Sequence, residues 1–120
     1  KRVDGKYCVF SNGGRINTGI DAIEWAELGE KNGAGELVVN SIDTDGVRNG
    51  FDLELLKDIS KNLSIPVIAS GGAGNMEHFK DVFMLEGVDA GLAASIFHFK
   101  EIDIMDLKRY LEKNNIVVRI

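Results

Sequence analysis

The sequence is poor in cysteine, in excess positive charge and in long apolar runs, and each shortage excludes a class of protein. Its single cysteine, Cys8, rules out an internal disulfide framework and is compatible with the reducing cytoplasm. The net charge is −5 and Lys and Arg are scattered, so nucleic acid is not an expected partner. No apolar run approaches the roughly 20 residues that a membrane span needs. Residues 1–7, KRVDGKY, lack an apolar segment, so we expect no signal peptide and a cytoplasmic protein.

Histidine is also scarce, and its placement predicts no metal site. His78 and His98 lack the spacing of metal ligands, and no Cys/His cluster accompanies them. We expect His78 to be a surface or packing residue of a helix. Cys8 is expected to pack in a strand, and Trp25 on a helix.

What the sequence has in abundance is a regular succession of strand and helix patterns. A β-hairpin is predicted at residues 6–18, because Asn12-Gly13 supplies the positive φ angles of a tight turn. A helical pattern begins at Asp21, and Asp52 is suited to cap a second helix. Three βα units are predicted to begin at residues 36, 66 and 90, with their helices at 52–63, 75–87 and 103–115.

The three strands are short and do not alternate apolar with polar residues, which is typical of parallel strands covered on both faces. Their starts recur about every 25 to 30 residues, near the repeat of an eight-stranded βα barrel. A single domain of residues 1–120 is expected. Two architectures remain open: a small open α/β sheet, and part of a (β/α)8 barrel.

Small and acidic residues stand at the carboxyl ends of these strands. They are Asp43-Thr44-Asp45-Gly46, Ser70-Gly71-Gly72-Ala73-Gly74 and Ala94-Ser95. Parallel strands place such ends side by side, and ligands bind there in both architectures. Glycine N–H groups, a serine hydroxyl and a helix N-terminus together suit a phosphate group. Residues 97–101, FHFKE, are placed to form the short extra helix of such a site.

Each candidate residue also has a purely structural interpretation. The glycine run alone is typical of a tight strand-to-helix turn, and the AAS sequence one unit later makes the phosphate interpretation more specific. Asp45 either positions substrate or moves a proton, which we favour, or it caps a turn. For Asp43 we favour a structural role. Ser95 is either a phosphate contact or a small residue at the start of a helix.

Taken together, these motifs resemble the cyclase subunits of imidazole glycerol phosphate synthase, a (β/α)8-barrel family of histidine biosynthesis. The resemblance rests on DTDG, ASGGAG and LAASIFHF at the three strand ends. The opening KRVDG, the hairpin ending in NTG and the tail LKRYLEKNNIVVRI also fit, so it covers essentially all 120 residues. Related barrels of histidine and tryptophan biosynthesis share the glycine-rich element, whereas DTDG favours the cyclase.

The resemblance implies a particular fold and an incomplete site. A complete cyclase is about twice this length, so the chain is expected to be a (β/α)4-type C-terminal half of a TIM (β/α)8 barrel, with parallel strands, alternating helices and an N-terminal β-hairpin. The family's principal catalytic aspartate pair has no counterpart here, and the chain alone is expected to be inactive. Asp45 is implied as a supporting catalytic residue. The implied phosphate-binding residues are Gly46, Ser70, Gly71, Gly72, Ala94 and Ser95.

The resemblance also implies the reaction and the partners. The family uses ammonia to convert a bisphosphorylated phosphoribulosyl-formimino aminoimidazole carboxamide ribonucleotide into imidazole glycerol phosphate and aminoimidazole carboxamide ribonucleotide, with no metal or organic cofactor. A separate glutaminase subunit supplies the ammonia. Glu36 matches a charged residue of the family at the entrance through which ammonia reaches the barrel. Two alternatives are a non-catalytic half-barrel that self-associates and retains only phosphate binding, and a remnant of a complete subunit.

Overall fold

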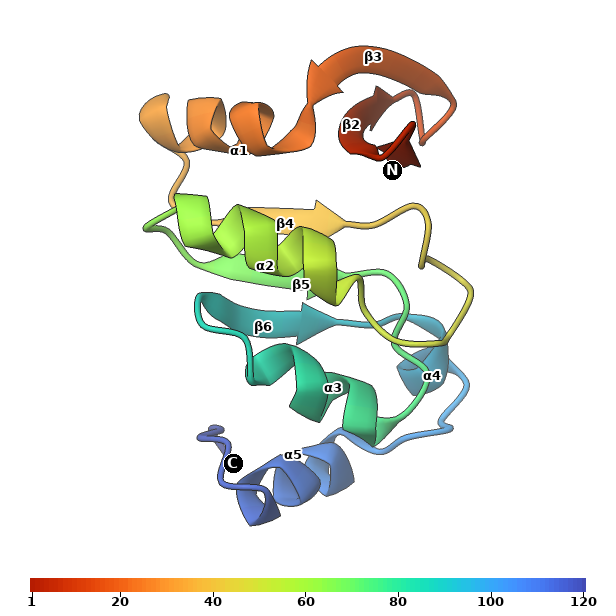
Figure 1. Cartoon of the computed structure of the whole chain (residues 1–120). Helices are drawn as coiled ribbons and strands as arrows, with labels where there is room; N and C mark the ends of the chain where they lie inside the picture. Colours follow the sequence, from red (N-terminus) through yellow and green to blue (C-terminus); the bar gives the residue numbers. More distant parts are fainter.

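Two three-stranded sheets organise the computed structural model, which describes residues 1–120 (Figure 1). The N-terminal sheet is antiparallel and consists of β1 (Arg2–Val3), β2 (Lys6–Ser11) and β3 (Ile16–Asp21). The second sheet is parallel, in the order β4 (Leu37–Asn40), β5 (Val67–Ser70) and β6 (Val88–Leu92). The chain therefore has an α/β fold with a parallel sheet, as the sequence predicts.

Helices connect the parallel strands and pack on one side of their sheet. Figure 1 shows α2 and α3 lying across the same face of this sheet, with α5 beside α3 and α1 near α2. The five helices are α1 (Ala22–Lys31), α2 (Leu53–Asn62), α3 (Met76–Phe83), α4 (Ser95–His98) and α5 (Ile104–Lys113).

Short polar side chains begin the four longer helices. Asp21, Asp52, Asn75 and Asp103 each accept a hydrogen bond from a backbone N–H in the first turn that follows. Such a cap satisfies donors that have no partner inside the helix. The predicted cap at Asp52 is confirmed, and Asn75 caps α3.

The core lies between the parallel sheet and its helices, and Phe79 of α3 is at its centre. The Phe79 ring is buried, 5.3 Å from the Phe51 ring and 5.9 Å from the Phe97 ring, measured between centroids. Gly91 of β6 makes room for it, since a Cβ there would lie 3.0 Å from Phe79 Cδ1. Ring packing of this kind joins α3 to the loop before α2 and to α4, and so holds the strand-to-helix loops together.

The other face of the parallel sheet is open. Val67 of β5 points toward the helices and is 0% exposed, whereas Val38 of β4 is 58% exposed. Val38 is the register partner of Ile68, which in turn pairs with Ala90. The expectation that both faces of these strands are covered is wrong at Val38, which is exposed on the face opposite the helices.

Several element bounds differ from the predicted ones. The third βα unit starts at Val88 rather than at residue 90, because Val88 pairs with Val67 at the start of the strand. The strand ends at Leu92, and Ala94 already has helical backbone angles, so Ser95 begins α4 instead of ending a strand. The short helix predicted at 97–101 accordingly lies at 95–98.

In the N-terminal sheet, β3 extends to Asp21, beyond the predicted limit of residue 18. The turn between β2 and β3 has positive φ at Asn12 (55°) and Gly13 (67°). Arg2 and Val3 form β1 and pair with β2, which the sequence pattern did not indicate.

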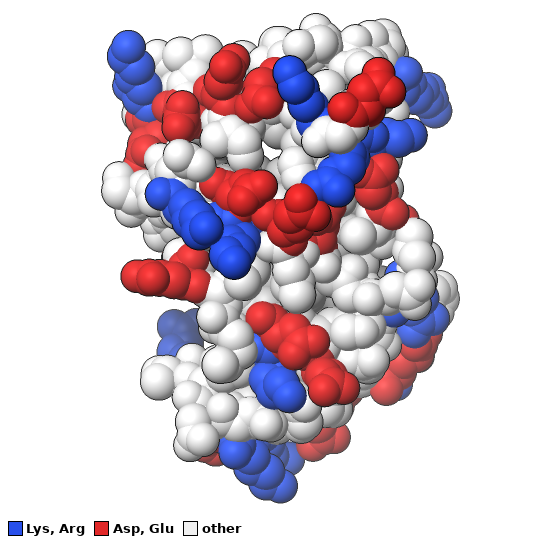
Figure 2. Space-filling view, viewed as in Figure 1, with Lys and Arg blue, Asp and Glu red and all other residues white.

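No helix in the structure is long and apolar enough to span a membrane. On the face shown in Figure 2, acidic and basic side chains are interspersed and form no continuous basic patch. No group of three or more His, Cys, Asp or Glu side chains is arranged to hold a metal ion.

Candidate functional site

A pocket of about 270 Å³ lies at the carboxyl ends of the three parallel strands. Its walls come from the β4–α2 loop, the β5–α3 turn, and the end of β6 with the start of α4. The structure thus brings together seven residues singled out in the sequence, which are far apart along the chain. They are Asp45, Gly46, Ser70, Gly71, Gly72, Ala94 and Ser95.

The β5–α3 turn presents bare backbone to this pocket. Gly71 and Gly72 both have positive φ, of 88° and 116°. Their N–H groups, and those of Ala94 and Ser95, donate to no other group of the chain. Unpaired N–H groups from two neighbouring strand ends form a concave donor surface of the kind that binds anions.

Close packing against the β4–α2 loop explains why this turn is glycine. A Cβ added at Gly72 would overlap the carbonyl oxygen of Gly50, whose own N–H donates to the Gly72 carbonyl at 2.8 Å. The Thr44 hydroxyl donates to the Gly71 carbonyl at 2.9 Å. Both turn carbonyls are therefore held by the neighbouring loop, while the unpaired N–H groups belong to residues that line the pocket.

Asp45 belongs to a hydrogen-bonded chain across the strand ends. The Asn40 amide donates to Asp45 Oδ2 at 3.4 Å, and the Ser70 hydroxyl donates to Asn40 Oδ1 at 2.9 Å. Asn40 and Ser70 are register partners at the ends of β4 and β5. The Ser70 hydroxyl proton is therefore engaged by Asn40, so the hydroxyl does not donate to a ligand in this state.

Asn40 is a site residue that sequence reasoning missed. The available signal was one amide side chain ending the otherwise apolar run LVVN at the carboxyl end of β4. Arg48 was missed as well, although it lines the pocket and its guanidinium forms an ion pair with Glu101. Nothing in the sequence spacing pairs residue 48 with residue 101.

Asp43 lies outside the pocket and joins the β4–α2 loop to the N-terminal segment. Its carboxylate accepts the backbone N–H of Arg2 at 2.6 Å. The Tyr7 hydroxyl donates to Asp52 Oδ1 at 3.0 Å, and the Ser41 hydroxyl donates to the other oxygen at 2.8 Å. These contacts accord with the structural role favoured for Asp43.

The same cluster shifts two pKa values. Burial, followed by the hydrogen bond to Asp52, raises the pKa of Tyr7 to about 12. The hydrogen bond to Glu54 raises the pKa of the Arg2 guanidinium, which also stacks 4.6 Å from the Tyr7 ring centroid. Both shifts favour the protonated forms of Arg2 and Tyr7, whose hydrogen bonds to Glu54 and Asp52 join the N-terminal sheet to the start of α2.

The remaining candidates have local roles or lie elsewhere. His78 Nδ1 accepts the N–H of Gly74 at 3.0 Å, which is a structural contact at the start of α3. Trp25 is half exposed rather than packed, with 51% of its surface accessible. Glu36 is exposed just before β4, at the amino end of the strands, and so lies at the opposite end of the sheet from the pocket.

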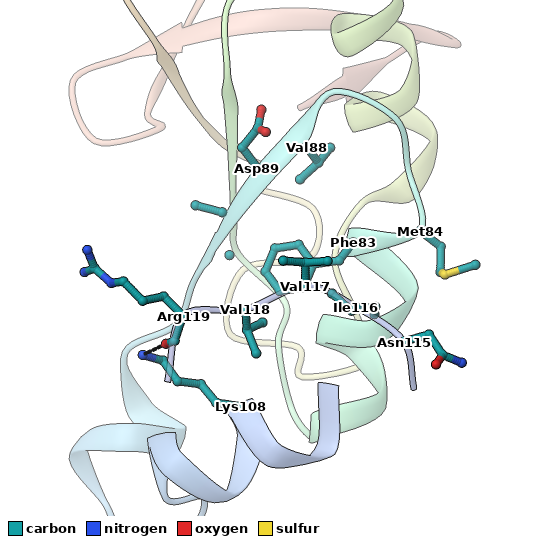
Figure 3. A pocket seen from close by; sticks show the side chains of 12 residues that line it. Phe83, Met84, Val88, Asp89, Lys108, Asn115, Ile116, Val117, Val118 and Arg119 are labelled. Carbon is teal, nitrogen blue, oxygen red and sulfur yellow. Dashed lines mark hydrogen bonds between the residues drawn. The ribbon is translucent and has the colours of Figure 1, made fainter. Parts of the chain in front are cut away.

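A larger pocket, of about 750 Å³, runs beside β6 rather than at the strand ends (Figure 3). Figure 3 shows Val117 and Val118 of the C-terminal segment among the side chains that line it, together with Phe83 and Val88. Lys108 Nζ donates to the Arg119 carbonyl at 2.6 Å and holds this segment to α5. This pocket contains none of the seven residues gathered at the strand ends.

Comparison with known proteins assigns a family to this arrangement. A family model described as "Histidine biosynthesis protein" matches residues 2–103. The chain belongs to this histidine biosynthesis family. The match includes all three strand ends that form the 270 Å³ pocket and stops at the residue that caps α5.

Three curated relatives of this chain carry the name "Imidazole glycerol phosphate synthase subunit HisF". The relative from Oceanobacillus iheyensis is 60% identical over 115 residues, which are 96% of this chain and 45% of the relative. Relatives from Clostridium botulinum strains Kyoto and Okra are 52% and 51% identical, each over 98% of this chain and 49% of the relative. The chain thus spans about half the length of the curated relatives it matches.

Proposed function

We propose that the 270 Å³ pocket binds one phosphate group of a bisphosphorylated ribonucleotide, in the reaction named for the HisF relatives. The observation that carries this proposal is that four residues with unpaired backbone N–H groups, Gly71, Gly72, Ala94 and Ser95, line one pocket. Backbone donors fixed by packing need no reorganisation when an anion arrives, which favours its binding.

The reaction proposed for the complete barrel is that of a cyclase. Ammonia would add to the formimino arm of the ribonucleotide, the molecule would be cleaved, and the imidazole ring would close, giving imidazole glycerol phosphate and aminoimidazole carboxamide ribonucleotide. Asp45 lies at the pocket wall and would act there as a supporting proton donor, acceptor or positioning group. The principal aspartate pair of the family would come from outside residues 1–120, so this chain alone would not turn over substrate.

Two grooves support the proposal that this chain is half of a (β/α)8 barrel. β4 and β6 each pair with β5 alone, so each has a free edge. A mostly hydrophobic groove borders β4 and is lined by residues such as Phe10 and Ile42, and the 750 Å³ pocket borders β6. Strands added at both edges would close the sheet and bury the open face of Val38.

A glutaminase partner is proposed at the amino end of the strands. Glu36 is exposed there and faces away from the phosphate pocket, so an ammonia source at that end would not obstruct the substrate. The two ends of the sheet would then serve ammonia delivery and ring formation separately.

Phosphate titration tests the proposed site directly. Inorganic phosphate would be titrated into the 120-residue chain and followed by isothermal calorimetry and by ³¹P NMR line width. Ser95→Asp, which adds a carboxylate to the pocket, should weaken binding at least about tenfold, whereas the neutral Ser95→Asn of similar size should change it by less than about threefold. Absence of saturable binding by the parent chain would refute the phosphate site.

A second candidate function, a self-associating half-barrel, is favoured by the exposed apolar sheet face. Val38 and Leu92 on this face are 58% and 48% exposed. We expect the parent chain to sediment as a dimer or larger species, and Val38→Glu to shift it toward the monomer. Ile104→Glu, at an exposed position on α5, is the matched control and should leave the distribution unchanged. A parent chain that sediments as a monomer would exclude this candidate.

A further inference from the structure

We infer that Arg48 is an additional phosphate-binding residue of the 270 Å³ pocket, and that Glu101 occupies its guanidinium when no anion is bound. The inference rests on the proposed phosphate site and assigns to it a cationic residue and a competing carboxylate. It arises from the ion pair between Arg48 and Glu101 at a pocket that Arg48 lines.

A phosphate bound in this pocket would add negative charge beside Asp45, and a cation is needed to offset it. Among the side chains that line it, Asp45 is the one carboxylate and Arg48 is the one cation. A phosphate that entered beside Asp45 would meet like charge, and backbone N–H groups supply only partial positive charge. Arg48 is therefore the one lining residue that can offset both charges, and its planar guanidinium suits two phosphate oxygens at once.

The backbone of Arg48 is held against the glycine turn. Arg48 has a φ of +66°, which is unusual for a residue with a side chain. A Cβ added at Gly74 would overlap the Arg48 carbonyl oxygen, so this turn and residue 48 are in direct contact. The Gly50 N–H bonded to Gly72 fixes the loop two residues later. The strained position of Arg48 is thus maintained by the glycine-rich turn whose first residues, Gly71 and Gly72, line the pocket.

Glu101 is placed to release Arg48. The two side chains are 44% and 39% exposed, and ion pairs in such surroundings add little to stability. Glu101 lies three residues after α4, the helix whose first residue, Ser95, lines the pocket. The ion pair thus spans from the β4–α2 loop to the segment after α4. Glu101 contacts the guanidinium through Oε2 alone, whereas a phosphate bound in the pocket could accept two of its N–H groups at once.

Three variants of these two residues test the inference by titration with inorganic phosphate under the conditions given above. Arg48→Gln removes the cation and should weaken binding about tenfold or more. Arg48→Lys keeps the positive charge but loses the planar guanidinium. Its phosphate affinity should lie between those of Arg48→Gln and the parent. Glu101→Gln removes the competitor and should tighten binding by about two- to fivefold. Far-UV circular dichroism checks that each variant is folded.

Glu101→Gln distinguishes two roles for the ion pair: competition with phosphate for Arg48, and holding the two loops in place. If the ion pair only held the two loops in place, Glu101→Gln would weaken phosphate binding as Arg48→Gln does, and that result would overturn the inference. Unchanged binding in Arg48→Gln would overturn it too, while leaving the phosphate site intact if Ser95→Asp still weakens binding at least about tenfold. A parent chain that binds no phosphate would remove the site and this role together.

Discussion

Replacing Gly72 by alanine should lower the free energy of unfolding by more than the cost of placing alanine at a positive φ. Gly72 has a φ of +116°, a conformation that costs an alanine about 1–2 kcal/mol. The new Cβ would overlap the Gly50 carbonyl oxygen, so the two loops must separate by about 1 Å before ordinary contact is reached. That movement breaks the hydrogen bond from Gly50 N–H to the Gly72 carbonyl, worth about 1 kcal/mol. The expected loss is about 2–4 kcal/mol.

Gly33→Ala is the matched control for this substitution. Gly33 also has a positive φ, of 99°, but no atom lies within 4 Å of the Cβ it would carry. Gly33→Ala should therefore lower the free energy of unfolding only by the cost of the positive φ, about 1–2 kcal/mol. The difference between the two variants isolates the contact between the β5–α3 turn and the β4–α2 loop.

Urea unfolding followed by far-UV circular dichroism measures both values, at one fixed protein concentration because self-association would alter apparent stability. Phosphate titration of the folded variants adds a second readout, since displacement of the turn in Gly72→Ala should weaken binding and Gly33→Ala should not. If the unfolding free energies of the two variants agreed within about 0.5 kcal/mol, the argument that packing dictates the glycine at position 72 would be wrong.

Three further predictions concern the core, a helix cap and Tyr7. Phe79→Ala, at the centre of the aromatic cluster, should cost about 3–5 kcal/mol in urea unfolding, and a loss below about 1 kcal/mol would contradict the central place given to this ring. Asp103→Ala removes the cap that accepts from two N–H groups of α5 and should cost about 1 kcal/mol, whereas Asp103→Asn should retain most of that stability. Because the pKa of Tyr7 is raised to about 12, its contribution is complete below pH 10, the unfolded value, and is lost as pH rises from 10 to 12, by at most about 3 kcal/mol. Tyr7→Phe should flatten that part of the pH profile, and an unchanged slope would show that another group is responsible.

The polar network around Tyr7 joins the N-terminal segment to the loop that forms one wall of the pocket. Asp43 accepts from the backbone of Arg2, and Tyr7 donates to Asp52, so the N-terminal segment is tied to both ends of the β4–α2 loop. This loop also carries Asp45 and Arg48 to the pocket. The segment that precedes β2 and the pocket wall are therefore parts of one hydrogen-bonded unit, although they are more than 40 residues apart.

The sequence by itself determined the order of the elements and the residues that meet at the strand ends. Apolar runs and caps such as Asp52 are local signals, and parallel strands place their carboxyl ends together whatever else the chain does. That rule alone brought Asp45, Ser70 and Ser95 into one group, which the structure places around one pocket. The end of β6 was less predictable, because AGLAAS has no feature that marks where a strand turns into a short helix.

Only the tertiary structure decided how the side chains at this site are engaged. Asn40 bridges Ser70 and Asp45 because register sets β4 and β5 side by side, and no spacing within one segment reveals this. Arg48 meets Glu101 because the β4–α2 loop packs on the glycine-rich turn and the segment after α4 ends beside that loop. Local propensity acts over a few residues, whereas these contacts depend on how whole elements pack, so the sequence indicated where a ligand binds and the fold decided which side chains are free to hold it.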